Sequence, residues 1–257
     1  MVNRLFHFAL AFTLMSATTV FAQGEVFPRE RGPVVVVELF TSQSCPVCPD
    51  ADAFAAELEM EPGVIVLSWP VDIWDYLGWE DTLASPDNTR RQAQYNGRFG
   101  LRWPYTPELI IDGRTHLPGN QREEVMSRIA EIRRESWVEV PVHLRLMEDQ
   151  LVVNIGEASE TMPDALGTLW LIPYRNHPDV EITAGPNSGR TLFYTHVAEN
   201  AQVISQWAGS PVIVRHPVDN APGETPDGYV VLLHKHRSGP ILGAARLQVT
   251  WDGANAD

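Results

Sequence analysis

The 257-residue sequence has little cysteine and little positive charge. Its two cysteines lie three positions apart, so they cannot join distant parts of a fold and have either a chemical role or a local one. Lys and Arg together number 19 against 33 Asp and Glu, which gives a net charge of −14. Because an acidic surface repels a phosphate backbone, we expect no nucleic-acid partner.

Long apolar runs are also scarce, and the clearest one lies near the N-terminus. Arg4 precedes an apolar stretch at 5–15, and Val20-Phe21-Ala22 follows with small side chains where a signal peptidase reads them. The stretch is shorter than the ~20 residues that a membrane-spanning helix needs. We therefore expect residues 1–22 to be a cleaved signal peptide rather than the alternative, a membrane anchor. The mature protein would then be periplasmic or secreted, with no stable membrane anchor.

What the sequence does contain is the pattern of a folded α/β protein, with 44% hydrophobic and 20% charged residues. Residues 33–40 and 64–67 are continuous apolar runs, typical of strands buried on both faces of a parallel sheet. The amphipathic stretch 50–61 between them predicts a helix. Strand, helix and strand in this order predict a βαβ unit with a right-handed crossover.

The next elements are marked by the residues at their ends. Ser85 and Pro86 predict a helix start with Ser85 as the N-cap, and Gly100 is expected to end that helix. A strand is predicted at 106–113, and an amphipathic helix at 120–135. These segments continue the alternation of strand and helix begun by the βαβ unit.

From about residue 138 the pattern changes to alternating strands. Stretches 138–146 and 151–155 alternate between apolar and polar residues across a polar turn, which predicts a hairpin. Four further short strands are predicted at 169–172, 212–214, 229–233 and 245–251. We therefore expect two domains after the signal peptide, an α/β domain at 23–137 and an antiparallel β-sandwich-like domain at 138–257.

The two cysteines form the pattern Cys45-Pro46-Val47-Cys48 between the first predicted strand and the first predicted helix. Free N–H groups and positive potential at a helix N-terminus stabilise a thiolate and lower the pKa of the first cysteine. This placement predicts Cys45 as the attacking thiol and Cys48, one turn further along, as the resolving thiol. An exported protein would meet an oxidising compartment, in which such a pair forms a disulfide.

Two other positions complete the predicted chemistry. A cis bond between Thr106 and Pro107 would leave a backbone edge beside the disulfide, where a substrate chain can pair. Glu38, in the strand before the pair, is a candidate to take the proton of Cys48. The alternative for Glu38 is a strand carboxylate satisfied by backbone donors.

An aromatic and acidic segment at 69–81 lies between the second strand and the next helix. We expect it to pack against the body of the protein, and we take Trp74 and Trp79 as candidates to line a substrate groove. Residues 185–190, which read Gly-Pro-Asn-Ser-Gly-Arg, are interpreted as a turn. An anion-binding role for Arg190 is the alternative there.

These features resemble the thioredoxin superfamily, which places a CxxC motif at a helix start and a Thr-Pro before a later strand. More closely, the chain resembles an exported bacterial family catalogued as domain of unknown function 1223. The segments that carry this resemblance are 38–45, 71–79, 105–107 with 112–113, 185–190 and 239–245. The resemblance implies a thioredoxin-like N-terminal domain, export and a cis Pro107. Thioredoxins carry their buried carboxylate six residues before the first cysteine, whereas Glu38 lies seven before Cys45.

We therefore predict an exported thiol–disulfide oxidoreductase that works through the CPVC motif without a cofactor. Its substrates would be protein thiols or disulfides, with an unidentified periplasmic redox partner. The alternative is a non-catalytic periplasmic binding protein in which the disulfide is a structural clip. An exposed Cys45 beside a sheltered Cys48 would favour the enzyme.

A metal site is a further alternative for the cysteine pair. One CxxC supplies only two of the four ligands that zinc takes in structural sites, so two histidines would have to converge on it. The histidines available in the sequence for this purpose include His116, His234 and His236. Nothing in their spacing points to the cysteines, and we expect no metal.

Overall fold

A computed structural model describes residues 34–135, 140–160, 162, 166–218 and 225–249, so the signal peptide expected at 1–22 lies outside the described residues. The first half of the described chain contains β1 (Val35–Thr41), α1 (Pro49–Glu59), β2 (Val64–Pro70), the 3-10 helix η1 (Asp75–Leu77), α2 (Pro86–Phe99), β3 (Glu108–Ile111), β4 (Thr115–Pro118) and α3 (Arg122–Arg134). The second half contains β5 (Val142–Met147), β6 (Gln150–Ile155), β7 (Gly167–Glu181), β8 (Thr191–Ala198), β9 (Gln202–Trp207), β10 (Val212–Pro217), β11 (Gly228–Lys235) and β12 (Ile241–Gln248).

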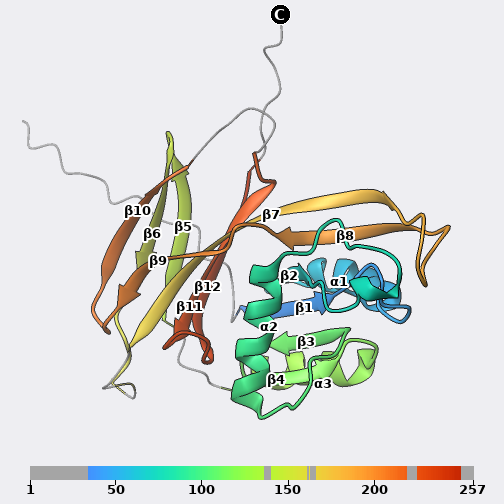
Figure 1. The fold of residues 1–257 in the computed structure, drawn as a ribbon. Helices are drawn as coiled ribbons and strands as arrows, with labels where there is room; N and C mark the ends of the chain where they lie inside the picture. Colours follow the sequence, from blue (N-terminus) through green and yellow to red (C-terminus); the bar gives the residue numbers. More distant parts are fainter. Residues whose placement is uncertain (1–33, 136–139, 161, 163–165, 219–224, 250–257) are drawn as a thin grey trace, which may run out of the picture.

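A mixed sheet runs through both halves of the molecule, in the order β12-β11-β7-β8-β2-β1-β3-β4, with β9 also paired to β7 (Figure 1). β1 and β2 pair in parallel, which confirms the βαβ unit, and β3 pairs antiparallel to β1. The halves join where Ser68 of β2 pairs with Val197 of β8. Strands from both sides of the boundary expected at 137/138 thus share one sheet.

The two faces of β1 are buried against different partners because successive side chains of a strand point to opposite sides. Val35, Val37 and Leu39 pack against α1 and α3. Val36 and Phe40 pack instead with Tyr95 of α2 and with residues of β7 and β11. β1 is buried along its whole length, as its continuous apolar sequence predicts.

A second, antiparallel sheet has the order β10-β6-β5 and packs on the C-terminal part of the mixed sheet. Val153 and Ile155 of β6 share a buried cluster with Leu171 of β7 and Val231 of β11. The β5–β6 hairpin confirms the one predicted from alternation. The expected two-layer β packing is therefore present, but one of its layers continues into the N-terminal half (Figure 1).

Helix α2 begins and ends as its sequence predicts. The Ser85 hydroxyl accepts a hydrogen bond from the backbone N–H of Asn88 at 3.2 Å, and Pro86 is the first helical residue. Gly100 closes the helix with φ of 73°, a left-handed conformation that glycine adopts without strain. The bounds of α2 matter for the site because this helix carries side chains that hydrogen-bond to β1 and to the loop before β3.

Candidate functional site

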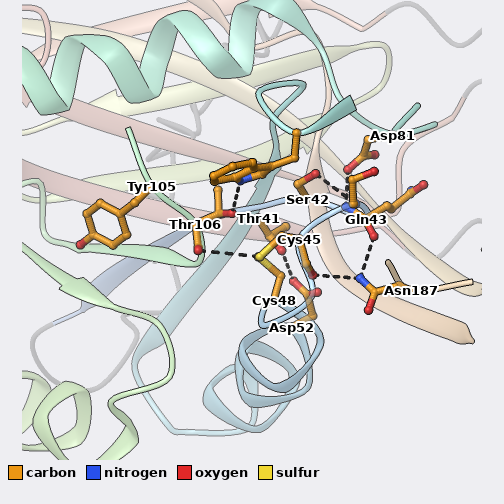
Figure 2. Close-up of a disulfide and its surroundings, with 12 residues drawn as sticks. Thr41, Ser42, Gln43, Cys45, Cys48, Asp52, Asp81, Tyr105, Thr106 and Asn187 are labelled. Atoms are coloured by element: carbon orange, nitrogen blue, oxygen red, sulfur yellow. Dashed lines mark hydrogen bonds between the residues drawn. A yellow bond between two sulfur atoms is a disulfide. The ribbon is translucent and has the colours of Figure 1, made fainter. Parts of the chain in front are cut away.

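A disulfide joins Cys45 and Cys48, whose Cα atoms are 5.4 Å apart, in the turn that connects β1 to α1 (Figure 2). We call residues 42–48 the disulfide turn. Cys48 is the N-cap residue of α1, and its carbonyl oxygen accepts hydrogen bonds from the N–H groups of Ala51 and Asp52. The Cys48 N–H in turn donates to the Cys45 carbonyl at 3.3 Å. The pair therefore occupies the predicted place at the start of a helix.

The loop before β3 brings its predicted residues to the disulfide. The bond between Thr106 and Pro107 is cis, as expected. The Thr106 carbonyl oxygen lies 3.7 Å from the Cys45 sulfur (Figure 2). The Trp74 indole N–H donates to the Thr106 hydroxyl at 2.7 Å. Three separate stretches of the sequence thus meet at one place: Cys45, Trp74 and the adjacent Thr106 and Pro107.

Both sulfur-bearing residues are buried, whereas the two residues between them are exposed. Cys45 is 3% exposed and Cys48 is fully buried, but Val47 is 55% exposed. The shelter expected for Cys48 is present, and the exposure expected for Cys45 is not. A thiol that attacks Cys45 must therefore first displace the residues that bury the Cys45 sulfur.

Residues 72–84, which we call the cover segment, are tied to the disulfide turn through Gln43. The Gln43 N–H donates to Asp81 at 2.7 Å, and the Gln43 side-chain oxygen accepts from the Trp79 indole at 2.7 Å. The Ser44 hydroxyl donates to the Trp79 carbonyl at 2.6 Å. The indole N–H and the carbonyl oxygen of Trp79 are therefore both hydrogen-bonded to the disulfide turn. The substrate contact expected of Trp79 stays a prediction.

Glu38 does not lie beneath the disulfide, so its expected position is wrong. Its side chain is on the α2 face of β1, where it accepts hydrogen bonds from Arg91, at 2.7 Å, and from the Tyr95 hydroxyl. The physical reason is the alternation of the strand: Leu39 points toward α1, so Glu38 must point away from it. Glu38 is satisfied by side-chain donors and not by the backbone donors of the alternative reading.

A buried carboxyl on the α1 side, Asp52, was missed by the sequence reasoning. Its Oδ1 accepts a hydrogen bond from the Thr41 hydroxyl at 2.6 Å, while its Oδ2 is buried without a hydrogen-bond partner. Burial raises the pKa of Asp52 to about 8. Asp52 follows Cys48 by four residues on α1, so the two side chains share a helix face (Figure 2). That spacing is the signal by which the sequence could have shown it.

A second residue missed by the sequence reasoning, Asn187, comes from the turn between β7 and β8. Its side-chain amide donates to the carbonyl oxygens of Gln43, at 2.8 Å, and Cys45, at 2.9 Å (Figure 2). The segment 185–190 is a turn, as predicted, but it reaches the disulfide turn. Arg190 donates to the Asn187 side-chain oxygen at 3.2 Å. No local sequence signal links Asn187 to a cysteine 142 residues away.

The three candidate histidines for a metal site are occupied elsewhere or lie apart. His234 is fully buried, and its ring nitrogens lie 3.1 Å from Arg91 and 2.9 Å from the Gly239 carbonyl. Burial lowers the pKa of His234 to about 3. His116 lies 3.1 Å from the Tyr105 hydroxyl, and His236 follows the end of β11. Within the described ranges, no three His, Cys, Asp or Glu residues gather as metal ligands would.

The fold and site together define a mixed α/β protein with a disulfide at a helix N-terminus and a cis-proline loop against its first sulfur. The family described as Protein of unknown function (DUF1223) matches residues 36–234, and the chain belongs to that family. In the part of the chain that the structure describes, no helix has the length and apolar character needed to cross a membrane.

Two solved structures are similar to this chain. A crystal structure of a protein from Agrobacterium tumefaciens has 31% sequence identity and a TM-score of 0.74, with 86% of this chain and 96% of that chain covered. HBP35 of Porphyromonas gingivalis has 13% identity and a TM-score of 0.61, with 85% and 76% covered, and this likeness concerns the fold alone. No curated protein matches the chain.

Proposed function

We propose that the protein is an exported, thioredoxin-like thiol–disulfide oxidoreductase that acts on protein thiols or disulfides through Cys45 and Cys48. The observation that carries the proposal is the 3.7 Å contact between the Cys45 sulfur and the carbonyl oxygen that precedes cis-Pro107. A polypeptide that pairs with the backbone of this loop would bring its own sulfur to Cys45. Export and the periplasmic location are parts of this proposal.

In the oxidising direction, a substrate thiolate attacks the Cys45 sulfur, and the bond between Cys45 and Cys48 breaks. Cys48 leaves with the electron pair and takes a proton. A second substrate thiolate then attacks the substrate sulfur of the mixed disulfide and releases Cys45 as a thiolate. The substrate loses two electrons and the cysteine pair gains them. The N–H groups at the start of α1 stabilise the Cys45 thiolate.

Asp52, in place of Glu38, is the proton carrier in this proposal. With a pKa of about 8 its carboxyl holds a proton at neutral pH, and it lies on the helix face of Cys48. As Cys48 leaves, the Asp52 carboxyl gives up its proton and the thiolate becomes a thiol. In the reducing direction the Asp52 carboxylate takes that proton back before Cys48 attacks the mixed disulfide.

A second candidate function is favoured by the burial of both cysteines. In a non-catalytic binding protein the disulfide would be a clip that fixes the start of α1 and the loop before β3. The cover segment and the β strands of the second half would then form the recognition surface. A binding function does not require a substrate thiol to reach Cys45.

The reduction potential of the cysteine pair separates the two functions. We would titrate the protein lacking residues 1–22 in glutathione buffers, with Cys45→Ser as the control that cannot form the disulfide. A potential of roughly −270 to −120 mV matches known exchange proteins and would support the proposal. A value below about −300 mV marks a structural disulfide and would favour the binding protein.

A further inference from the structure

The tip of the β7–β8 hairpin reaches the disulfide turn from the other half of the chain. Asn187 at this tip is 2% exposed, and both of its described donor contacts end on main-chain carbonyls of the disulfide turn. One of these carbonyls belongs to Cys45 and also accepts the N–H of Cys48. A single amide therefore binds the Gln43–Ser44 and Cys45–Pro46 peptide groups, and the second of these also accepts the hydrogen bond that joins the two cysteines.

The orientation of this amide is itself determined by its surroundings. The Asn187 oxygen faces the Arg190 guanidinium, which can only donate, while the nitrogen faces two carbonyls, which can only accept. A flipped amide would lose all three hydrogen bonds. The Asn187 side chain is thus a rigid double donor aimed at the disulfide turn.

The hairpin tip is shaped for a close approach to the site. Gly185 and Gly189 adopt φ of 70° and 82°, which allow the tight turn. A Cβ atom on Gly185 would lie 2.9 Å from the Cβ of Trp79 in the cover segment, so a larger residue would push the tip away. Gly185 is therefore explained by its φ angle and by its contact with the cover segment, and Gly189 by its φ angle.

We propose that Asn187 is a positioning residue for exchange at Cys45, an inference that rests on the proposed function. Forming the disulfide requires both sulfurs to meet, and their effective concentration depends on how closely the main chain of the reduced turn keeps to the disulfide geometry. Asn187 holds the Cys45 carbonyl in place whether or not the sulfurs are joined. Without the Asn187 hydrogen bonds, the main chain of the reduced turn can leave the geometry that the disulfide needs. The disulfide then forms less readily and is easier to reduce.

The test is the reduction potential of Asn187→Ala against the matched control Ser188→Ala, an exposed neighbour in the same turn. We expect Asn187→Ala to lower the equilibrium constant for disulfide formation about threefold to tenfold. This fold-change corresponds to a potential about 15–30 mV less negative, since tenfold is 29.6 mV for two electrons. Ser188→Ala is expected to keep the wild-type potential.

A purely structural role would not move this potential, because destabilising the oxidised and reduced forms equally leaves their ratio unchanged. Arg190→Gln provides a second variant, since Arg190 is exposed and its replacement leaves the buried amide present but less well oriented. It should shift the potential in the same direction by a smaller amount. It also keeps the inference testable if Asn187→Ala fails to fold.

The outcomes for the two proposals are distinct. If Asn187→Ala and Arg190→Gln both keep the wild-type potential, the positioning role is overturned while the exchange function stands. If the wild-type potential lies below about −300 mV, the exchange function is overturned. The potentials would then be measured in dithiothreitol buffers. A difference in reduction potential between Asn187→Ala and Ser188→Ala would still show that Asn187 positions the disulfide.

Discussion

At the scale of single residues, two buried carboxyl groups near the disulfide have opposite environments. Glu38 contacts the Arg91 guanidinium and is balanced by its charge, whereas Asp52 receives one hydroxyl hydrogen bond and leaves an oxygen without a partner. Burial raises the pKa of the Asp52 carboxyl to about 8, so this carboxyl holds a proton at neutral pH. The environment of Asp52 thus suits proton transfer, whereas Glu38 has a structural role as the ion-pair partner of Arg91.

We predict that Asp52→Asn slows exchange with a dithiol substrate by about 10²-fold at pH 7, because the leaving Cys48 loses its proton donor. The measurement is a stopped-flow trace of disulfide reduction. Glu38→Gln is the matched buried control: it leaves Arg91 without its counter-charge, so unfolding free energy falls by about 3–5 kcal/mol while the reduction potential keeps its value. Equal rates for wild type and Asp52→Asn would rule out the proton role.

Asp52 also predicts the pH dependence of stability. Its pKa is raised from 3.8 to about 8 by burial, so between these values the folded state holds a proton that the unfolded state has released. Stability should therefore fall as pH rises from about 4 to about 8, by up to about 1.4 kcal/mol per pH unit from this group. Urea unfolding at several pH values checks this, and Asp52→Asn should flatten the slope.

At the scale of elements, the cover segment is hydrogen-bonded to the residues that surround the disulfide. Its Trp74 donates to Thr106, whose carbonyl oxygen contacts the Cys45 sulfur, so the indole hydrogen bond ties the segment to the loop beside Cys45. Its other end is tied to Gln43 through Trp79 and Asp81. The segment is thus attached both to the loop before β3 and to the disulfide turn, and we expect these hydrogen bonds to limit access to the disulfide.

We predict that Trp74→Phe accelerates reduction of the disulfide by a small phosphine about fivefold. One hydrogen bond of about 1 kcal/mol is lost, and the open population rises accordingly. Alkylation of released thiols, followed by mass, measures the rate. Trp103→Phe is the control because Trp103 is exposed and contributes no described hydrogen bond to the site. Unchanged reduction in Trp74→Phe would mean that the segment does not limit access.

At the scale of the whole molecule, the N-terminal half is completed by the C-terminal half. β8 extends the sheet beside β2, and Ile172 and Val230 share a buried cluster with Val36 and Leu67. The Arg246 guanidinium of β12 pairs with Glu59 at the end of α1 at 2.8 Å. Separating the halves would expose this cluster and remove Asn187 from the disulfide turn.

We therefore predict that a fragment of residues 23–135 does not melt cooperatively, whereas residues 23–257 show one transition. The exposed faces of β1 and β2 should make the fragment associate, which size-exclusion chromatography detects. Thermal unfolding followed by circular dichroism is the second measurement. A fragment that melts cooperatively and keeps the full-length reduction potential would contradict this dependence and support an independent domain at 23–137.

Local elements were predictable because the residues that signal them lie close together in the sequence. The cap at Ser85, the stop at Gly100, the βαβ unit and the β5–β6 hairpin all follow from such signals. β4, β8 and β9 were not predicted. β9 is mostly exposed and lacks a regular apolar alternation, and β8 is flanked by polar turn residues that obscure its pattern. Their place is set by the strands they pair with.

By itself the sequence determined the chemistry that is available: two cysteines at the start of a helix, with a Thr-Pro and a tryptophan-rich segment further along. Only the tertiary structure decided which groups serve that chemistry. It turned Glu38 away from the cysteines, buried Asp52 on the helix face that it shares with Cys48, and brought Asn187 from 142 residues away. The reason is that sequence periodicity reports which face of an element is buried, whereas the partner of that face depends on how distant strands pair.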